Sequence, residues 1–340
     1  MKTVKNYTDL YTTTPQHIEQ NNREMNNVFF CNLYTCIKKM YSYDFKKDSN
    51  NTSIMDSISM IYGDVGEPNI ITISGDWGIY KDGSEYVGQG ASKQFRLTIP
   101  ELDSVLGRFD NWFCPHLEED IHEKIHPIPI NVFTPDWQKL VSKNIEELRE
   151  IKKDNLCYAN FSMTSLYRTT LAKWIPTQDY IDYLFPIFHL PAARREGVEM
   201  DIPSDGEWCE RKEHGLSLEE FATTLASYKF AIAPVGNGID TYRLWECILT
   251  NTVPIVQDTF CNRVFSKIWP MITVRRYELD NIQQKMSDFS KKHGDYIEYD
   301  YSLLLKKNFD KLLERLKHES NRVRRERAQM KPVEKIVIKF

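Results

Sequence analysis

The sequence predicts an α/β protein made of two halves, each built on a parallel sheet. The chain has 340 residues, which exceeds one ordinary domain and suits two domains of about 150 residues each. Hydrophobic residues make up 41% of the chain and aromatic residues 12%, so buried cores can be filled and wholesale disorder is excluded. Residues 228–256 follow the pattern strand, glycine turn, helix, strand, which is the βαβ unit of a parallel sheet.

Residues 1–152 are predicted to form the first half. A buried strand of β-branched residues runs over residues 69–74 and is followed by Gly75 and Asp76. Residues just after a strand face the ligand crevice of an open α/β sheet, so Asp76 is a candidate catalytic residue. The other predicted elements are a helix at 100–106, a strand at 112–114, a strand within 125–132 and an amphipathic helix at 136–152.

Residues 153–300 are predicted to form the second half, and residues 301–340 a C-terminal helix with a basic tail. Ser217 and Glu220 fit the capping box at the start of a helix. Asn251 stands where a left-handed residue would end the next helix, a conformation that asparagine tolerates well. Further elements are predicted as a strand at 156–159, a helix at 166–174, an inner strand at 253–256 and a helix at 301–329.

The turn at residues 236–238, Gly-Asn-Gly, precedes a helix that opens at Asp240 or Thr241. Such a turn directs backbone N–H groups and a helix N-terminus at one point, which favours an anion. Arg243 lies in the first helical turn, where the helix dipole disfavours a cation unless a negative ligand neutralises it. Two plainer interpretations stay open: the glycines serve only a tight turn, and Asp240 serves only as a helix cap.

Three segments together resemble a known enzyme family. The pattern KF-x-I-A-P-x-GNGID-x-x-RLWE, followed by a short loop and VPIV, resembles the C-terminal signature of exostosin-type glycosyltransferases. It is more distantly similar to the nucleotide-binding helix of α-1,3-fucosyltransferases. Asn160-Phe161-Ser162 with Arg168 resembles the other half of that donor site, and NWFCPH with HPIPINVF resembles the stretch before the domain crossover. The resemblance covers about residues 70–280.

The resemblance implies the architecture called GT-B, with two facing Rossmann-like halves, helices on both faces of the parallel sheets, and a C-terminal helix that packs back toward the first half. It implies transfer of a sugar from a nucleotide diphosphate donor to a hydroxyl of a glycan or glycosylated carrier. UDP is the favoured nucleotide and GDP the alternative. The donor-binding residues are then Asn160, Ser162, Arg168, Gly236, Asn237, Gly238, Asp240, Arg243 and Glu246.

Within this set, Arg168 and Arg243 are expected to form a clamp on the leaving diphosphate. A fold that supplies this charge requires no bound metal, so no cofactor is expected. The fucosyltransferase pattern has a glutamate for the ribose where this chain has Tyr242, which leaves the ribose to Asp240 or Glu246.

The acceptor side is less defined. An inverting transferase needs a general base, for which Asp76 and His116 are the candidates, whereas a retaining enzyme does not require one. His116 could equally be an ordinary loop histidine. A second function also stays open, namely a glycan-binding or scaffolding protein that has lost catalysis on the same fold.

Charge and composition limit the partners. The net charge of −4 argues against a general nucleic-acid binder. Residues 311–340 contain ten Lys/Arg and four Asp/Glu, and their basic helix predicts either a solvated face or a peripheral membrane contact through Arg322, Arg324, Arg325 and Arg327. No apolar run approaches the roughly 18 residues of a transmembrane segment. The seven cysteines are scattered, so a reducing compartment and a cytoplasmic enzyme are expected.

Overall fold

The fold is described from a computed structural model of the chain. It covers residues 28–32, 69–73, 79–81, 95–97, 106–107, 110–130, 135–162, 166–184, 216–236, 238–275, 281–305 and 308–329. Asp76, Asn237 and most of the helix predicted at 100–106 lie outside these residues.

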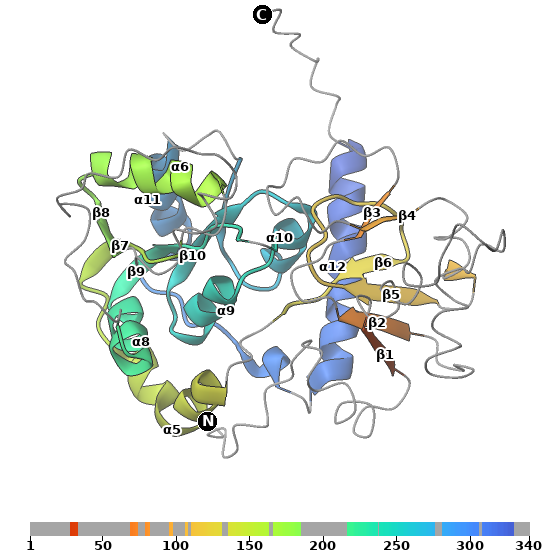
Figure 1. Cartoon of the computed structure of the whole chain (residues 1–340), viewed down its shortest axis with the longest axis horizontal. Coiled ribbons are helices and arrows are strands. Elements are labelled where there is room, and N and C mark those ends of the chain that lie inside the picture. Colours follow the sequence, from red (N-terminus) through yellow and green to blue (C-terminus); the bar gives the residue numbers. More distant parts are fainter. Residues whose placement is uncertain are drawn as a thin grey trace, which may run out of the picture.

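The first half contains a four-stranded parallel sheet. Its spatial order is β1-β2-β5-β6, with β1 (Val28–Asn32), β2 (Asn69–Ile73), β5 (Asn111–Cys114) and β6 (Ile125–Pro127). A separate parallel pair is formed by β3 (Ile79–Lys81) and β4 (Phe95–Leu97). The long helix α12 (Phe309–Gln329) comes from the far end of the chain and packs against β6, as Figure 1 shows. The predicted return of the C-terminal helix to the first half is therefore confirmed.

The second half contains a five-stranded parallel sheet in the order β8-β7-β9-β10-β11. Its strands are β7 (Asn155–Ala159), β8 (Ile181–Tyr183), β9 (Tyr228–Ile232), β10 (Val253–Gln257) and β11 (Ile272–Val274). The helices described in this half are α6 (Leu166–Trp174), α8 (Leu218–Ala226), α9 (Tyr242–Leu249), α10 (Phe260–Phe265) and α11 (Ile282–His293), with short 3₁₀ turns η4 (Ile175–Thr177) and η7 (Ser302–Leu304). The helix predicted at the end of the first half, α5 (Pro135–Glu150), packs against α8 and α9. The predicted α/β class with parallel sheets is confirmed, and β10 is an inner strand as expected.

Helices cover both faces of the second sheet. Successive side chains of a strand point to opposite faces. On β9, Phe230 and Ile232 therefore join a core with α6 and α11, whereas Ala231 joins the core on the other face with α8 and α9. That second core continues through Trp245 to Trp112 of the first sheet and to α12, so one hydrophobic core unites the two halves.

Local signals at the helix ends agree with the sequence. The Ser217 hydroxyl accepts a hydrogen bond from the Glu220 N–H, and the Glu220 carboxylate accepts one from the Ser217 N–H, which completes the predicted capping box. Asn251 has a φ of 57°, as expected, and its side chain bonds Tyr296 and Tyr299. The cap of α9 is Thr241, with no side-chain cap bond.

Two basic residues anchor the C-terminal end of α5 to the second half: Arg149 in its last turn and Lys153 just after it. Arg149 is buried and donates to the carbonyls of Leu249 and Tyr299. The Lys153 ammonium donates to the carbonyls of Ala226 and Thr250, which end α8 and α9. Cations are favourable at helix C-termini because the helix dipole is negative there. Burial lowers the pKa of Lys153 to about 7.

The C-terminal helix begins later than predicted. The sequence pattern suggested a helix from residue 301, but residues 302–304 form the turn η7 and α12 starts at Phe309. The Asp300 carboxylate accepts the Ser302 N–H and Asn308 donates to the Ser302 carbonyl, so local side-chain bonds stabilise a turn instead of a helix. Within the residues that the structure describes, no helix is long and apolar enough to cross a membrane.

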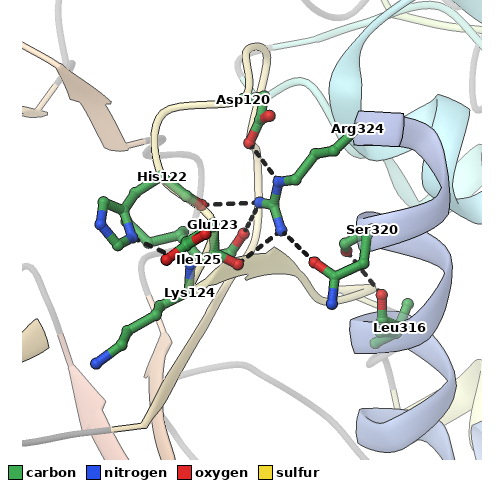
Figure 2. Close-up of polar contacts among 9 residues, drawn as sticks. Asp120, His122, Glu123, Lys124, Ile125, Leu316, Ser320 and Arg324 are labelled. Carbon is green, nitrogen blue, oxygen red and sulfur yellow. Dashed lines mark hydrogen bonds and ion pairs between the residues drawn. The ribbon is translucent and has the colours of Figure 1, made fainter. Parts of the chain in front are cut away.

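The basic face of α12 is not uniformly solvated. Arg324 is directed at the loop before β6, as Figure 2 shows, and all five of its N–H groups are used. Their acceptors are the carboxylate of Asp120, the side chain of Asn321 and the carbonyls of His122, Glu123 and Ile125, at distances of 2.6–3.1 Å. The prediction of a solvated or membrane-facing Arg324 is therefore wrong, whereas Arg325 and Arg327 are exposed.

His126 on β6 is buried beneath this contact, with 1% of its surface exposed. Neither ring nitrogen has a hydrogen-bond partner in the described part of the chain, and the ring lies against Phe113. Burial, together with the positive charges of Arg324 and Lys317, lowers the pKa of His126 to about 3. The native protein thus holds this histidine neutral.

We predict that Arg324→Lys lowers the free energy of unfolding by about 1–3 kcal/mol. A lysine keeps the charge but cannot reproduce the planar fork that reaches several carbonyls at once. Urea denaturation measures the effect, and Arg325→Lys on the exposed neighbour is the matched control. Equal stability of the two variants would contradict the role given to Arg324.

We also predict that His126 makes the protein acid-sensitive. Because the native pKa is depressed below the unfolded value of about 6.5, only the unfolded chain binds the proton between these values. Stability is thus full above pH 6.5 and falls as the pH drops toward 3, by about 2 kcal/mol at pH 5 from this group. His126→Leu should flatten the decline in urea denaturation between pH 7.5 and 5, whereas His318→Leu on an exposed face of α12 should not. Parallel pH profiles for wild type and His126→Leu would refute the assignment.

Candidate functional site

The candidate site lies where the strand order of the second sheet reverses. The chain passes from β7 to β8 on one side and from β8 back to β9 on the other side of β7. Ala159 and Ile232, near the carboxyl ends of β7 and β9, are paired directly. The loops that leave these two strands therefore diverge, and a crevice at such a point is where open α/β sheets bind ligands.

A cavity of about 280 Å³ occupies this position. Eight of the nine predicted donor-binding residues line it, and the ninth, Asn237, lies outside the described residues. The eight come from the loop after β7, from α6, and from the turn and first helical turns after β9: Asn160, Ser162, Arg168, Gly236, Gly238, Asp240, Arg243 and Glu246. Phe161, Thr241, Tyr242 and Ile130 complete the lining, and Ile130 is contributed by the first half.

Arg168 joins the two loops that form the cavity. Its Nε donates to the Val235 carbonyl at 2.9 Å, and its two terminal nitrogens donate to the carbonyls of Ser162 and Pro234 at 3.1 Å each. The guanidinium therefore links the end of β7 to the end of β9. The sequence suggested a diphosphate contact for Arg168, and the structure adds a cross-link that fixes the wall of the cavity.

The two glycines of the turn are required by neighbouring side chains. A Cβ on Gly236 would lie 2.7 Å from a terminal nitrogen of Arg168, and a Cβ on Gly238 would lie 2.4 Å from Cε1 of His116. Real Cβ atoms essentially never approach other atoms so closely. The sequence analysis expected the glycine turn to leave room for an anion. At Gly238, the missing side chain leaves room for the His116 ring.

His116 connects the first half to this turn. It has a φ of 60°, is 1% exposed, and its Nδ1 accepts the Asp240 N–H at 3.1 Å. It lies behind Gly238 and does not belong to the residues that line the cavity. The structure gives His116 a contact between the two halves, and its proposed role as a general base stays a prediction. So does that of Asp76, which lies outside the described residues.

Asp240 is a second connection between the halves. One carboxylate oxygen accepts the Ile130 N–H at 2.8 Å and the other accepts the Trp245 Nε1–H at 2.9 Å. Burial raises the pKa of Asp240 to about 7, although these bonds and one from the Thr241 N–H oppose the rise. Asp240 therefore does not cap α9, and both of its oxygens are occupied by protein donors. Of the two ribose candidates, Glu246 is the more available.

Arg243 lies in the first turn of α9, as predicted, and is held on two sides. Its Nε donates to Glu246 Oε2 at 2.9 Å, and its Cζ lies 4.2 Å from the centre of the Phe221 ring. The NH1 nitrogen is buried and has no hydrogen-bond partner in the described part of the chain. A buried donor without a partner costs about 1–3 kcal/mol, a cost that an anionic ligand in the cavity would remove.

Asn160 is oriented by a stack of tyrosines. Its Nδ2 donates to the Tyr158 hydroxyl at 3.1 Å, and the Tyr158 ring stacks on Tyr228 with centroids 4.8 Å apart. The Tyr228 hydroxyl in turn donates to Asp182. Burial raises the pKa of Tyr158, while the Asn160 bond and the charge of Arg243 lower it, so the hydroxyl stays protonated near Arg243. This wall of the cavity is therefore pre-organised.

Sequence reasoning missed two contributors to the site. Phe221 lies on α8, 22 residues before Arg243, and no local pattern links the two positions. Ile130 lies in the proline-rich stretch quoted for the family resemblance, which gave no signal that its N–H would bond Asp240.

Comparison with known proteins adds little to this geometry. No family model and no curated protein matches the chain. Among solved structures, the chain is similar to one described as trehalose-6-phosphate from E. coli bound with UDP-2-fluoro glucose, with 11% identity and a TM-score of 0.31. The match covers 93% of this chain and 86% of that one. A TM-score of this size supports no argument about function, and the exostosin-type resemblance stays a prediction.

We predict that Gly238 and His116 are energetically coupled. Gly238→Ala should lower the free energy of unfolding by about 1–3 kcal/mol, because the added methyl group overlaps the imidazole. In a His116→Ala background the same change should cost markedly less, since the obstructing ring is gone. A double-mutant cycle by urea denaturation measures the coupling. Additive costs would show that the glycine serves another purpose, such as close approach of a ligand to the backbone.

Proposed function

We propose that this protein is a glycosyltransferase that takes a sugar from a nucleotide diphosphate donor and transfers it to a hydroxyl of a glycan or glycosylated carrier. A UDP-sugar is the favoured donor and a GDP-sugar the alternative, on the strength of the exostosin-type resemblance. The observation that carries the proposal is the cavity at the strand reversal, which is lined by eight sequence-predicted donor residues, among them Arg243, whose NH1 has no hydrogen-bond partner within the described residues.

The charges around the cavity suit a diphosphate. Arg168 and Arg243 reach it from the helices that follow β7 and β9, and the N-terminus of α9 borders it at Thr241. Negative charge on the diphosphate increases as the bond to the sugar breaks, so fixed cations stabilise the transition state more than the bound donor. We therefore propose catalysis without a bound metal.

The remaining polar groups suit a ribose and an acceptor. Glu246 already holds Arg243 through one oxygen, and its carboxylate lines the cavity, so it is our candidate for the ribose hydroxyls. Ile130 brings the first half to the edge of the cavity, which is where an acceptor bound to that half would meet the sugar. The general base is not assigned.

We also propose that the enzyme is cytoplasmic, on the basis of its cysteines. Cys114, Cys157, Cys247 and Cys261 are buried free thiols. Burial raises the pKa of each thiol, which keeps it protonated and unreactive. These cysteines support a cytoplasmic enzyme.

Isothermal titration with UDP, GDP and a panel of UDP-sugars, followed by a donor-hydrolysis assay, tests the function. Binding with turnover supports a transferase. Binding of glycans without binding of any nucleotide would instead support the glycan-binding alternative and overturn the proposal.

We predict that Arg243→Ala costs about 2–4 kcal/mol of transition-state stabilisation, seen mainly in kcat. Arg243→Lys should recover part of the loss, because a point charge remains while the fork geometry does not. Arg263→Ala is the matched control, since Arg263 pairs with Asp258 and does not line the cavity. Full activity of the Arg243→Ala variant would show that Arg243 takes no part in catalysis and would contradict the proposed site.

A further inference from the structure

The surroundings of Arg243 leave a distinct part of its guanidinium unused. The Nε–H is donated to Glu246, and Cζ of the guanidinium lies over the Phe221 ring, 4.2 Å from the ring centroid. Only 15% of the side chain is accessible. The terminal NH1 has no hydrogen-bond partner in the part of the chain that the structure describes.

Phe221 is itself firmly placed. It lies on α8, is 9% exposed, and meets Trp137 of α5 edge-on with ring centroids 6.3 Å apart. The Phe221 ring is therefore part of the hydrophobic core between α5 and α8.

We propose that Phe221 is a positioning residue that holds the Arg243 guanidinium ready for the diphosphate of the donor; this inference rests on the function proposed above. An aromatic face attracts a cation through its quadrupole and uses none of its N–H groups. A second carboxylate in the same place would occupy those donors and cancel the charge. The ring thus orients the guanidinium while its donors stay available to an anion.

A positioning role for Phe221 and a simple packing role predict different effects on ligand affinity. If the ring acts through Arg243, its loss weakens only ligands that carry the diphosphate. UDP and uridine share the nucleoside but differ in the diphosphate, so titration of both ligands separates positioning from general damage to the site.

The experiment compares Phe221→Leu with Phe221→Tyr, using UDP and uridine as probes. We expect Phe221→Leu to weaken UDP about threefold to tenfold and to leave uridine unchanged, the range that a lost cation–π contact gives. Phe221→Tyr keeps the ring face and should bind UDP like wild type. Trp137→Leu removes the edge contact to Phe221 without touching Arg243 and is the control for packing.

A variant with nearly unchanged shape guards against loss of folding. Replacing Phe221 by pentafluorophenylalanine enlarges the ring only slightly but reverses its quadrupole, so it should weaken UDP binding while the melting temperature changes little. In an Arg243→Ala background, the Phe221 changes should have no further effect on UDP. Equal weakening of UDP and uridine, or unchanged UDP binding by Phe221→Leu and the fluorinated variant, would overturn the inference.

The two proposals fail in different ways. If Arg243→Ala binds UDP as tightly as wild type, the proposed donor site is wrong and the inference about Phe221 falls with it. If Arg243→Ala weakens UDP but the Phe221 variants do not, the donor site stands and only the positioning role is lost.

Discussion

The guanidinium of Arg168 holds together the two loops on which the candidate site depends. The loops start where the paired strands β7 and β9 end, at Ala159 and Ile232, so strand pairing no longer sets the distance between the two loops beyond these residues. By bonding the carbonyls of Ser162, Pro234 and Val235, Arg168 fixes that distance and satisfies backbone groups that would otherwise be unpaired. The same contact explains why residue 236 is a glycine, because any side chain there would displace the guanidinium.

Four partly or fully buried arginines of the described residues differ in what their N–H groups bind. Arg149, Arg168 and Arg324 donate to backbone carbonyls and act as cross-links between segments far apart in sequence. Arg243 is held by a carboxylate and an aromatic ring, and part of its guanidinium has no protein acceptor in the described residues. This difference separates an arginine that stabilises the fold from one that is prepared for a ligand, more clearly than position near a glycine turn does.

Signals that act over a few residues were readable from the sequence. The capping box at Ser217, the left-handed Asn251 and the inner strand β10 all depend on neighbouring residues, and all three predictions are confirmed. The cavity lining was also predictable, because the loops after two adjacent parallel strands start side by side at the same edge of the sheet. The contacts of Arg324 and His116 were not, since their partners lie up to 204 and 124 residues away and no local pattern encodes such pairing.

The place of α12 beside β6 also bears on how the chain is completed during synthesis. A ribosome releases residues in order, and the helix that covers the first sheet emerges after the strands of both sheets. The bond from Arg324 to Asp120 joins residues 204 positions apart, so the first sheet is covered by α12 only after the second sheet has been synthesised. Within the described residues, the strands of the second sheet and the α-helices that pack on it end by residue 293. In this protein the half that is made first is finished last.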